Sequence, residues 1–205
     1  YCPSEHVGDW GTQTGNWAVN TKTHPDGLLD VAAKVKENGM KFLLWIEPER
    51  VIASNPTPRE HPDWYFKRRG DNRENATWLL NLGDEGAFEG TAEMGEHSIE
   101  TLSLGWYRQD FNTDPLPYWR DNDEPGRVGI NEIKHVMGLY RLWDRLLEKF
   151  PALIIDNCAS GGRRIDIETL RRSIPLWRSD YQCTWDFDPE TSQTHNIGFS
   201  SWLPF

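Results

Sequence analysis

The chain has 205 residues and a net charge of −10, from 22 Lys and Arg against 32 Asp and Glu. Aromatic residues make up 12% and hydrophobic residues 37%, which is too rich in core-forming side chains for a disordered protein. An acidic surface repels phosphate backbones and so argues against nucleic-acid binding. The sequence also lacks the roughly 18–20 consecutive apolar residues of a membrane-spanning helix. Three cysteines are too few for a disulfide framework.

The two ends of the sequence look like the interior of a domain. The chain begins Tyr-Cys-Pro-Ser, without Met, and stops at Trp-Leu-Pro-Phe directly after a short apolar run. Natural termini are usually polar and poorly ordered. We therefore expect residues 1–205 to be one domain, an internal fragment of a longer protein. The compartment stays open, with the cytoplasm slightly favoured.

Short apolar runs alternate with amphipathic stretches along the chain. Six runs predict strands, at residues 41–46, 78–82, 104–108, 153–155, 174–177 and 197–202. Apolar residues at helical spacing predict four helices, over residues 28–35, 84–103, 130–147 and 165–170. Strands separated by helices of this length imply βαβ units and a parallel sheet.

Two long connections favour one α/β architecture. Residues 53–77 and 111–128 each contain three prolines, and structureless loops of this length are usually functional. Both follow a strand, where a (β/α)8 TIM barrel builds its active site, and a complete barrel needs about 250 residues. We therefore predict a barrel that lacks its first strand and its C-terminal end. A doubly wound open sheet is the alternative, although no Gly-rich phosphate loop opens a helix here.

Carboxylates follow five of the predicted strands. They are Glu47 and Glu49, Asp84 and Glu85, Asp110, Asp156, and Asp180. Acidic residues after a strand often cap the next helix, and we expect that role for Asp84 and Glu85. No helical pattern follows Asp110 until about residue 129, and an aromatic loop follows Asp180. A functional role is therefore favoured for Asp110 and Asp180.

Two carboxylates that face each other across a barrel mouth suit glycosidic cleavage. One attacks the anomeric carbon and the other protonates the leaving oxygen, with about 5–5.5 Å between them in retaining enzymes. A surplus of tryptophan also favours a sugar, because flat rings pack on its C–H faces; Trp106 and Trp177 are instead expected in the core. The tryptophans expected in loops or at strand ends are Trp10, Trp17, Trp45, Trp64, Trp119 and Trp185.

Other chemistries fit the sequence less well. A ring of acids suits a divalent cation, but the six histidines show no close ligand spacing, and His97 and His135 fall in predicted helices as surface or packing residues. Cys158 and Cys183 are too far apart for a CxxC zinc site, so we expect no metal. The segment around Ser160 lacks the Gly-x-Ser-x-Gly spacing of a nucleophile elbow. Its glycines are expected to let the backbone approach a ligand closely.

Four motifs, in order, resemble those of glycoside hydrolase family 36, the melibiase-type α-galactosidases. They are Trp45-Ile-Glu-Pro-Glu-Arg-Val, Tyr107-Arg-Gln-Asp-Phe-Asn112, Cys158-Ala-Ser-Gly-Gly-Arg-Arg-Ile-Asp166 and Arg178-Ser-Asp180. The resemblance implies a single catalytic barrel domain that hydrolyses α-galactosides with retention, without a metal or another cofactor. It also implies that the full-length protein can form homo-oligomers.

The resemblance also assigns roles to residues. Asp110 matches the nucleophile and Asp180 the acid/base. Arg108 stands where the family usually has a sugar-binding Lys, and Cys158 to Gly161 match the segment beside the 2-hydroxyl. Arg73 matches a substrate-binding Arg only if the alignment takes a gap. The full expected substrate-binding set is Trp45, Arg73, Arg108, Asn112, Cys158, Ser160, Gly161 and Gly162.

Departures from the family pattern bear on the substrate more than on the reaction. Arg108-Gln109 replaces a Lys-aromatic pair, Arg163 stands in place of a third Gly, and Tyr181 replaces Asn or Asp. A planar guanidinium binds bidentately where an ammonium does not, so another α-glycoside is a possible substrate. The alternatives left open are an α-galactosyl transferase, an α-N-acetylgalactosaminidase, an inactive sugar-binding fragment and a metal-dependent lyase or isomerase barrel.

The two proposed catalytic acids need different surroundings. Asp110 must stay ionised, and we expect Arg108 or Arg73 to lower its pKa. Asp180 must hold a proton, which needs a dry setting. The side chains expected to provide that apolar cover are Trp177, Tyr181 and Trp185.

Overall fold

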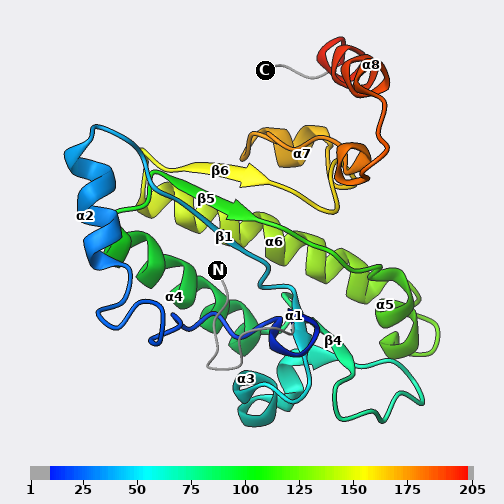
Figure 1. Ribbon diagram of the computed structural model, residues 1–205. Coiled ribbons are helices and arrows are strands. Elements are labelled where there is room, and N and C mark those ends of the chain that lie inside the picture. Colours follow the sequence, from blue (N-terminus) through cyan, green and yellow to red (C-terminus); the bar gives the residue numbers. More distant parts are fainter. Residues whose placement is uncertain (1–9, 203–205) are drawn as a thin grey trace.

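The computed structural model describes residues 10–202. Its main sheet has three parallel strands in the order β1–β5–β6 (Figure 1). They are β1 (Leu43–Ile46), β5 (Trp106–Gln109) and β6 (Ile154–Asn157). A parallel bridge between Asp156 and Ile174 continues the sheet by one position. Three predicted strands are therefore confirmed, whereas the predicted strand 174–177 is reduced to this single bridge.

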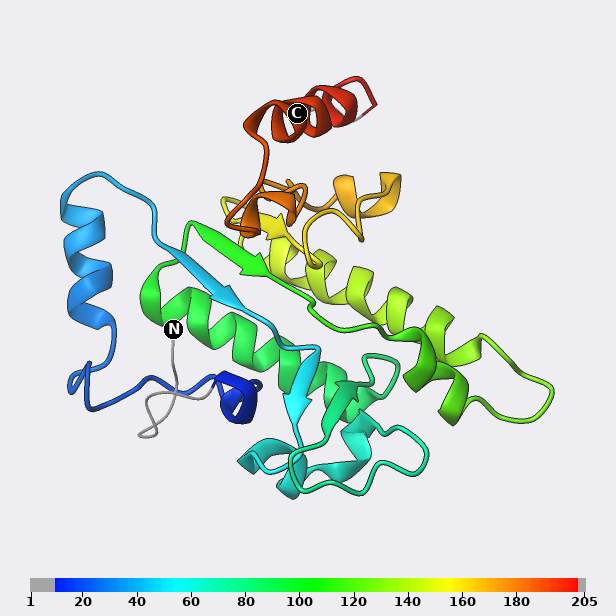
Figure 2. The same ribbon diagram turned by 45° about the vertical axis from the view of Figure 1, so that its right-hand side comes forward.

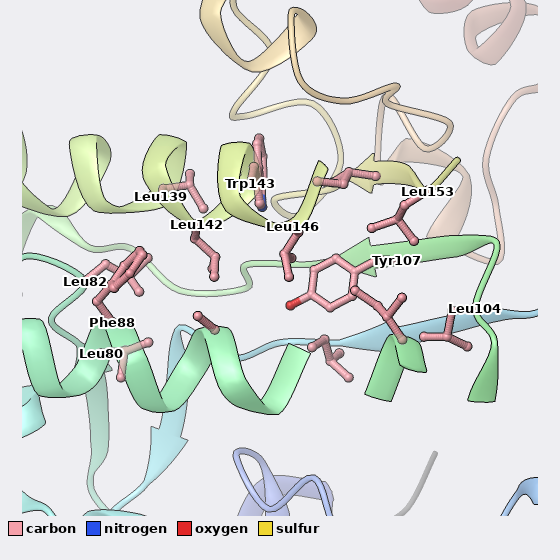
Figure 3. Close-up of a cluster of buried hydrophobic side chains, with 14 of the residues drawn as sticks. Leu80, Leu82, Phe88, Leu104, Tyr107, Leu139, Leu142, Trp143, Leu146 and Leu153 are labelled. Carbon is pink, nitrogen blue, oxygen red and sulfur yellow. The ribbon is translucent and has the colours of Figure 1, made fainter. Parts of the chain in front are cut away.

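Two long amphipathic helices cover one face of this sheet. They are α4 (Glu85–Leu102) and α6 (Ile130–Lys149), which pack side by side (Figures 1 and 2). Apolar residues from both helices meet Leu104, Tyr107 and Leu153 in the main core (Figure 3). Burial of such side chains contributes about 1.5–3 kcal/mol each, so the core fixes the strands that carry the site.

The predicted helices are confirmed with small shifts at their ends. Beside α4 and α6, the shorter predicted ones are α2 (Leu29–Glu37) and α7 (Ile167–Leu170). The predicted cap is also present, because an Asp84 carboxylate oxygen accepts from the N–H of Ala87 at 2.9 Å. Glu85 lies in the first turn of α4 and pairs with Arg141.

A second, antiparallel sheet contradicts the prediction that residues 78–82 form a barrel strand. Its order is β2–β4–β3, formed by Arg50–Ile52, Thr77–Leu80 and Tyr65–Phe66. An apolar run does not encode the direction of its partner, and here the chain turns back on itself. The connection expected to be structureless holds β3, α3 (Pro56–Glu60) and a short 3-10 helix, η1 (Pro62–Trp64).

The strand predicted at residues 197–202 is also wrong. Most of it lies in α8 (Pro189–Ser200), which starts with Pro189 after an Asp188 cap whose side chain accepts from the N–H of Glu190. These are helix start signals that the apolar run obscured. The remaining elements are α1 (Trp10–Gln13), α5 (Leu116–Asn122) in the loop after β5, and η2 (Tyr181–Cys183).

The architecture is α/β. The parallel sheet β1–β5–β6, here called the parallel wall, and its helical crossovers are arranged as in part of a βα barrel. The strands of residues 10–202 form two open sheets and do not close into a barrel. None of the helices in this range is long and apolar enough to cross a membrane.

Candidate active site

The face of the main sheet opposite α4 and α6 carries the predicted site. Side chains alternate along a strand, and Tyr107 on β5 and Ile155 on β6 point into the helix-covered core, 0% and 1% exposed. Trp45, Arg108 and Asp156 pair directly in register across the three strands, so they share the other face. Asp110 follows β5 at this edge.

Asp110 is held as a carboxylate by hydrogen bonds. It is 7% exposed; its Oδ2 accepts from Trp45 Nε1 at 3.1 Å and its Oδ1 from the N–H of Phe111 at 2.8 Å. Burial alone would raise the pKa of Asp110, but these bonds and those from the Asn112 and Cys158 side chains outweigh it and lower the pKa. Hydrogen bonds, rather than the expected Arg108 or Arg73, are thus the principal cause of the lowering.

The loop after β6 is tied to the loop that carries Asp110. Burial and the negative charge of Asp110 raise the pKa of Cys158 to about 12, so its thiol stays neutral and can donate. Ser160 Oγ donates to Asn112 Oδ1 at 3.0 Å, and Arg163 in turn donates to Ser160 Oγ at 2.8 Å. The predicted residues Asn112, Cys158 and Ser160 are therefore brought together at Asp110.

The two glycines of this loop make room for the segment that carries Asp180. Gly161 has a φ of +78°, and a Cβ there would lie 2.7 Å from the backbone N of Asp180. A Cβ on Gly162 would lie 2.5 Å from the carbonyl O of Arg178, and an antiparallel bridge joins Gly161 to Ser179. The close approach expected toward a ligand is therefore made to the protein's own backbone.

Asp180 lies in a more open setting than expected. It is exposed, on a bend, and its Oδ1 accepts from Trp177 Nε1 at 2.9 Å. Trp185 is 95% exposed. The prediction that apolar side chains bury Asp180 is wrong in this respect, because residues 181–202 form two short helices that do not cover it.

The expected arginines have different positions. Arg108 bonds to Asp156 on the next strand through Nη1, and its side chain is 17% exposed. Arg73 lies in the loop between β3 and β4, where its guanidinium binds both oxygens of Asp71 at 2.8 and 2.7 Å. The structure thus places Arg108 beside the site but does not join Arg73 to it.

Some of the tryptophans lie near the site as predicted, and others do not. Trp45 binds Asp110 and meets the edge of Trp17, with ring centroids 5.9 Å apart, so both lie near the site as expected. Trp119 is buried in a small apolar cluster and does not present a free face, contrary to expectation. Trp177, expected in the core, instead reaches Asp180. The position of the Trp10 side chain lies outside the described residues.

A buried network beneath the site had no role in the sequence predictions. Glu49 is 0% exposed and accepts from Gln109 Nε2 at 2.8 Å, His135 Nε2 at 2.8 Å and Arg164 Nη1 at 2.6 Å. Burial would raise the pKa of Glu49, but Arg164 and His135 lower it to about 2. The neighbouring Glu47 accepts from the N–H of Asn112 at 2.5 Å. The partners of Glu49 lie 60 to 115 residues away in the sequence. The sequence therefore showed only that Glu49 is a carboxylate near the end of a strand.

No three His, Cys, Asp or Glu side chains converge as metal ligands within residues 10–202. The candidate site is a carboxylate, Asp110, surrounded by neutral hydrogen-bond donors, with a second carboxylate, Asp180, on an adjoining segment. This arrangement suits an anionic nucleophile paired with a proton donor.

Comparison with known proteins identifies the family of this chain. The family model described as Melibiase matches residues 6–186. The chain belongs to the melibiase family. An α-galactosidase from Escherichia coli is 31% identical over 199 residues, and the match covers 88% of this chain and 27% of the relative. The α-galactosidase AgaA from Geobacillus stearothermophilus is 28% identical over 168 residues, covering 81% of this chain and 23% of that protein.

Solved structures of this melibiase group have the same fold over nearly the whole chain. An α-galactosidase from Lactobacillus brevis superposes with a TM-score of 0.81 at 25% identity, covering 95% of this chain and 26% of its own. The GH36 α-galactosidase AgaA superposes with a TM-score of 0.80 at 26% identity, covering 96% and 27%. The chain spans about a quarter of the length of these relatives. Its own fold is consistent with a fragment of a TIM barrel.

Proposed function

We propose that the protein is a retaining α-galactosidase that releases terminal α-linked galactose from oligosaccharides or glycoconjugates. The observation that carries this proposal is Asp110: a nearly buried carboxylate at the end of β5 with a lowered pKa, on the open face of the sheet. The segment that bears Asp180 packs against the Cys158–Gly162 loop, which in turn binds Asp110.

In the first step, the ionised Asp110 attacks the anomeric carbon while Asp180 donates its proton to the glycosidic oxygen. The bond to the leaving group breaks and a galactosyl ester forms on Asp110. In the second step, Asp180 removes a proton from water, which attacks the anomeric carbon and frees Asp110. Asn112, Cys158 and Trp45 hold the Asp110 carboxylate in position during both steps.

The substrate class follows from the relatives. AgaA from Geobacillus stearothermophilus has been solved in complex with stachyose and with raffinose. We propose α-galactosides of this kind as substrates. The residues that would bind the galactosyl unit are Trp45, Arg108, Asn112, Cys158, Ser160, Gly161 and Gly162. The proposal involves no metal and no other cofactor, and the intact protein is proposed to be able to form homo-oligomers.

The test is hydrolysis of a nitrophenyl α-galactoside by the intact protein and by its Asp110→Asn and Asp180→Ala variants. We expect activity in the wild type, near-complete loss in Asp110→Asn and a smaller loss in Asp180→Ala, because nitrophenol leaves without protonation by Asp180. The first product seen by NMR should be α-galactose. β-Galactose as the first product would exclude the retaining mechanism. Asp110→Asn activity above about a thousandth of wild type would exclude Asp110 as nucleophile.

The same assay separates the alternative activities. Galactose transferred to an added sugar at a higher rate than to water would indicate a transferase. A preference for α-N-acetylgalactosaminides would indicate the related hydrolase. Galactose binding without turnover would indicate a sugar-binding protein.

A further inference from the structure

Asp156 is a buried carboxylate whose two oxygens serve two parts of the site. Oδ2 accepts from Arg108 Nη1, and Oδ1 accepts from the backbone N–H of Leu176 at 3.0 Å. Asp156 is 1% exposed. Arg108 lies two residues before Asp110, and Leu176 lies four residues before Asp180. One buried charge therefore connects the strand of the proposed nucleophile with the segment of the proposed acid/base.

We propose that Asp156 is a positioning residue that sets the affinity of the site for its sugar by fixing the guanidinium of Arg108. This inference rests on the proposed function. A charge-assisted hydrogen bond restricts a long, flexible side chain to one geometry. A guanidinium has five N–H donors, and the bond to Asp156 involves Nη1, so donors remain for sugar hydroxyls. The register of the sheet places Arg108 between Trp45 and Asp156 on the open face.

The backbone contact gives Asp156 a second positioning effect. The sheet continues past β6 through the bridge between Asp156 and Ile174. The side-chain bond to Leu176 extends this connection by two residues toward Asp180. A carboxylate at this position thus orients the sugar-binding guanidinium and the start of the acid/base segment together.

The experiment measures kcat and KM for a nitrophenyl α-galactoside in the intact protein and in Asp156→Asn, Arg108→Gln and the double variant. Asn keeps the shape of Asp but removes the charge. We expect Asp156→Asn to raise KM about tenfold, because Arg108 loses its charged partner and binds the ground state and the transition state equally less well. We expect kcat to change less than about threefold, because the Asn side-chain oxygen can still accept from the N–H of Leu176. The double variant should be no worse than Arg108→Gln alone, since both changes remove one interaction.

Asp144→Asn is the matched control. Asp144 on α6 binds Arg172, just after α7, through both oxygens at 2.7 and 3.0 Å, away from the site. Its loss should leave KM unchanged. An unchanged KM in Asp156→Asn, fully additive losses in the double variant, or the same rise in KM in Asp144→Asn would each overturn the inference.

Further measurements keep the inference testable if a variant or the assay fails. If Asp156→Asn does not fold, Arg108→Lys keeps the charge but loses the planar fork, and a wild-type KM in this variant would overturn the inference. If the wild type does not hydrolyse α-galactosides, the proposed function fails, and galactose binding by calorimetry replaces KM with the same tenfold expectation. A wild type that neither hydrolyses nor binds galactosides overturns both.

Discussion

Asp110 is 7% exposed and receives hydrogen bonds from side chains of β1 and of the loop after β6, whereas Asp180 lies exposed on a bend with a bond from Trp177. The first carboxylate is oriented by the ends of packed strands. The second depends on a segment that is placed by contacts between backbones at Gly161 and Gly162. A nucleophile needs a fixed trajectory and a fixed charge, while an acid/base must exchange protons with leaving groups and water. The difference in surroundings matches the difference in proposed roles.

The largest expected effects are losses of kcat in variants of the two carboxylates. Only the loss in the Asp180 variant should depend on the leaving group of the substrate. Asp110→Asn should lower kcat at least about a thousandfold for every substrate, because no covalent ester can form. Asp180→Ala should slow raffinose far more than a nitrophenyl α-galactoside, because nitrophenol leaves without protonation. Steady-state kinetics on both substrates measure this ratio. Equal losses of Asp180→Ala on both substrates would remove Asp180 from the acid role.

Glu49→Gln tests whether the buried network of Glu49 stabilises the packed strands that orient Asp110. The change should destabilise the fold by about 3–5 kcal/mol, because Arg164 and His135 lose a fully buried partner. The folded pKa of Glu49, about 2, lies below its usual value, so its contribution is full above about pH 4.5 and is lost as the pH falls toward 2. Urea unfolding at pH 7 and pH 3 measures both effects.

Glu85→Gln is the control for that change, since the Glu85–Arg141 pair is exposed to solvent and such pairs contribute little to stability. A difference between wild type and Glu49→Gln that stays constant from pH 7 to pH 3 would contradict the role given to the Glu49 charge.

Gly161→Ala tests the glycine contact that places Asp180. The new Cβ would clash with the Asp180 backbone, so kcat on raffinose should fall about 10- to 100-fold, since misplacement by about 1 Å has effects of this size. Gly126→Ala is the control, because Gly126 has a similar φ of +77° with nothing within 4 Å of the added Cβ. Gly126→Ala should lower the stability of the fold through backbone strain, but it should leave kcat unchanged. A normal kcat in Gly161→Ala would show that the contact does not position Asp180.

Trp45→Phe should have the smallest effect, on the pH profile. Removing the N–H bond to Oδ2 raises the pKa of Asp110, so the acid limb of kcat/KM should move to higher pH. Trp78→Phe, which makes the same replacement of indole by phenyl under Lys67 in the antiparallel sheet, should leave the limb in place. If the acid limb of the kcat/KM profile does not move in Trp45→Phe, the limb reports the ionisation of a group other than Asp110.

Much of the parallel wall was predictable from local periodicity. The strands at 41–46, 104–108 and 153–155 and the helices α4 and α6 were predicted because each buries one face or stripe, which leaves a repeat in the sequence. The run at 78–82 carries the same apolar signal but belongs to an antiparallel sheet. Periodicity reports burial and not the identity or direction of the partner strand.

The candidate site was predictable to a similar extent. Asp110, Asn112, Cys158 and Ser160 lie in short motifs, and the structure joins them by hydrogen bonds. Arg73 depended on a gapped match, and the structure keeps it with Asp71 in a surface loop. The roles of Asp110 and Asp180 stay predictions until the variants are measured.

The sequence by itself determined which segments are strands or helices of the parallel sheet and that a carboxylate lies at or just after the end of β1, β5 and β6, because these properties depend on residues close together in the chain. Only the tertiary structure decided what each carboxylate binds. Asp156 meets Arg108, 48 residues away, and Glu49 meets Arg164, 115 residues away. The ionisation of a buried carboxylate depends on such partners and on its burial, and both are set when distant strands pack together.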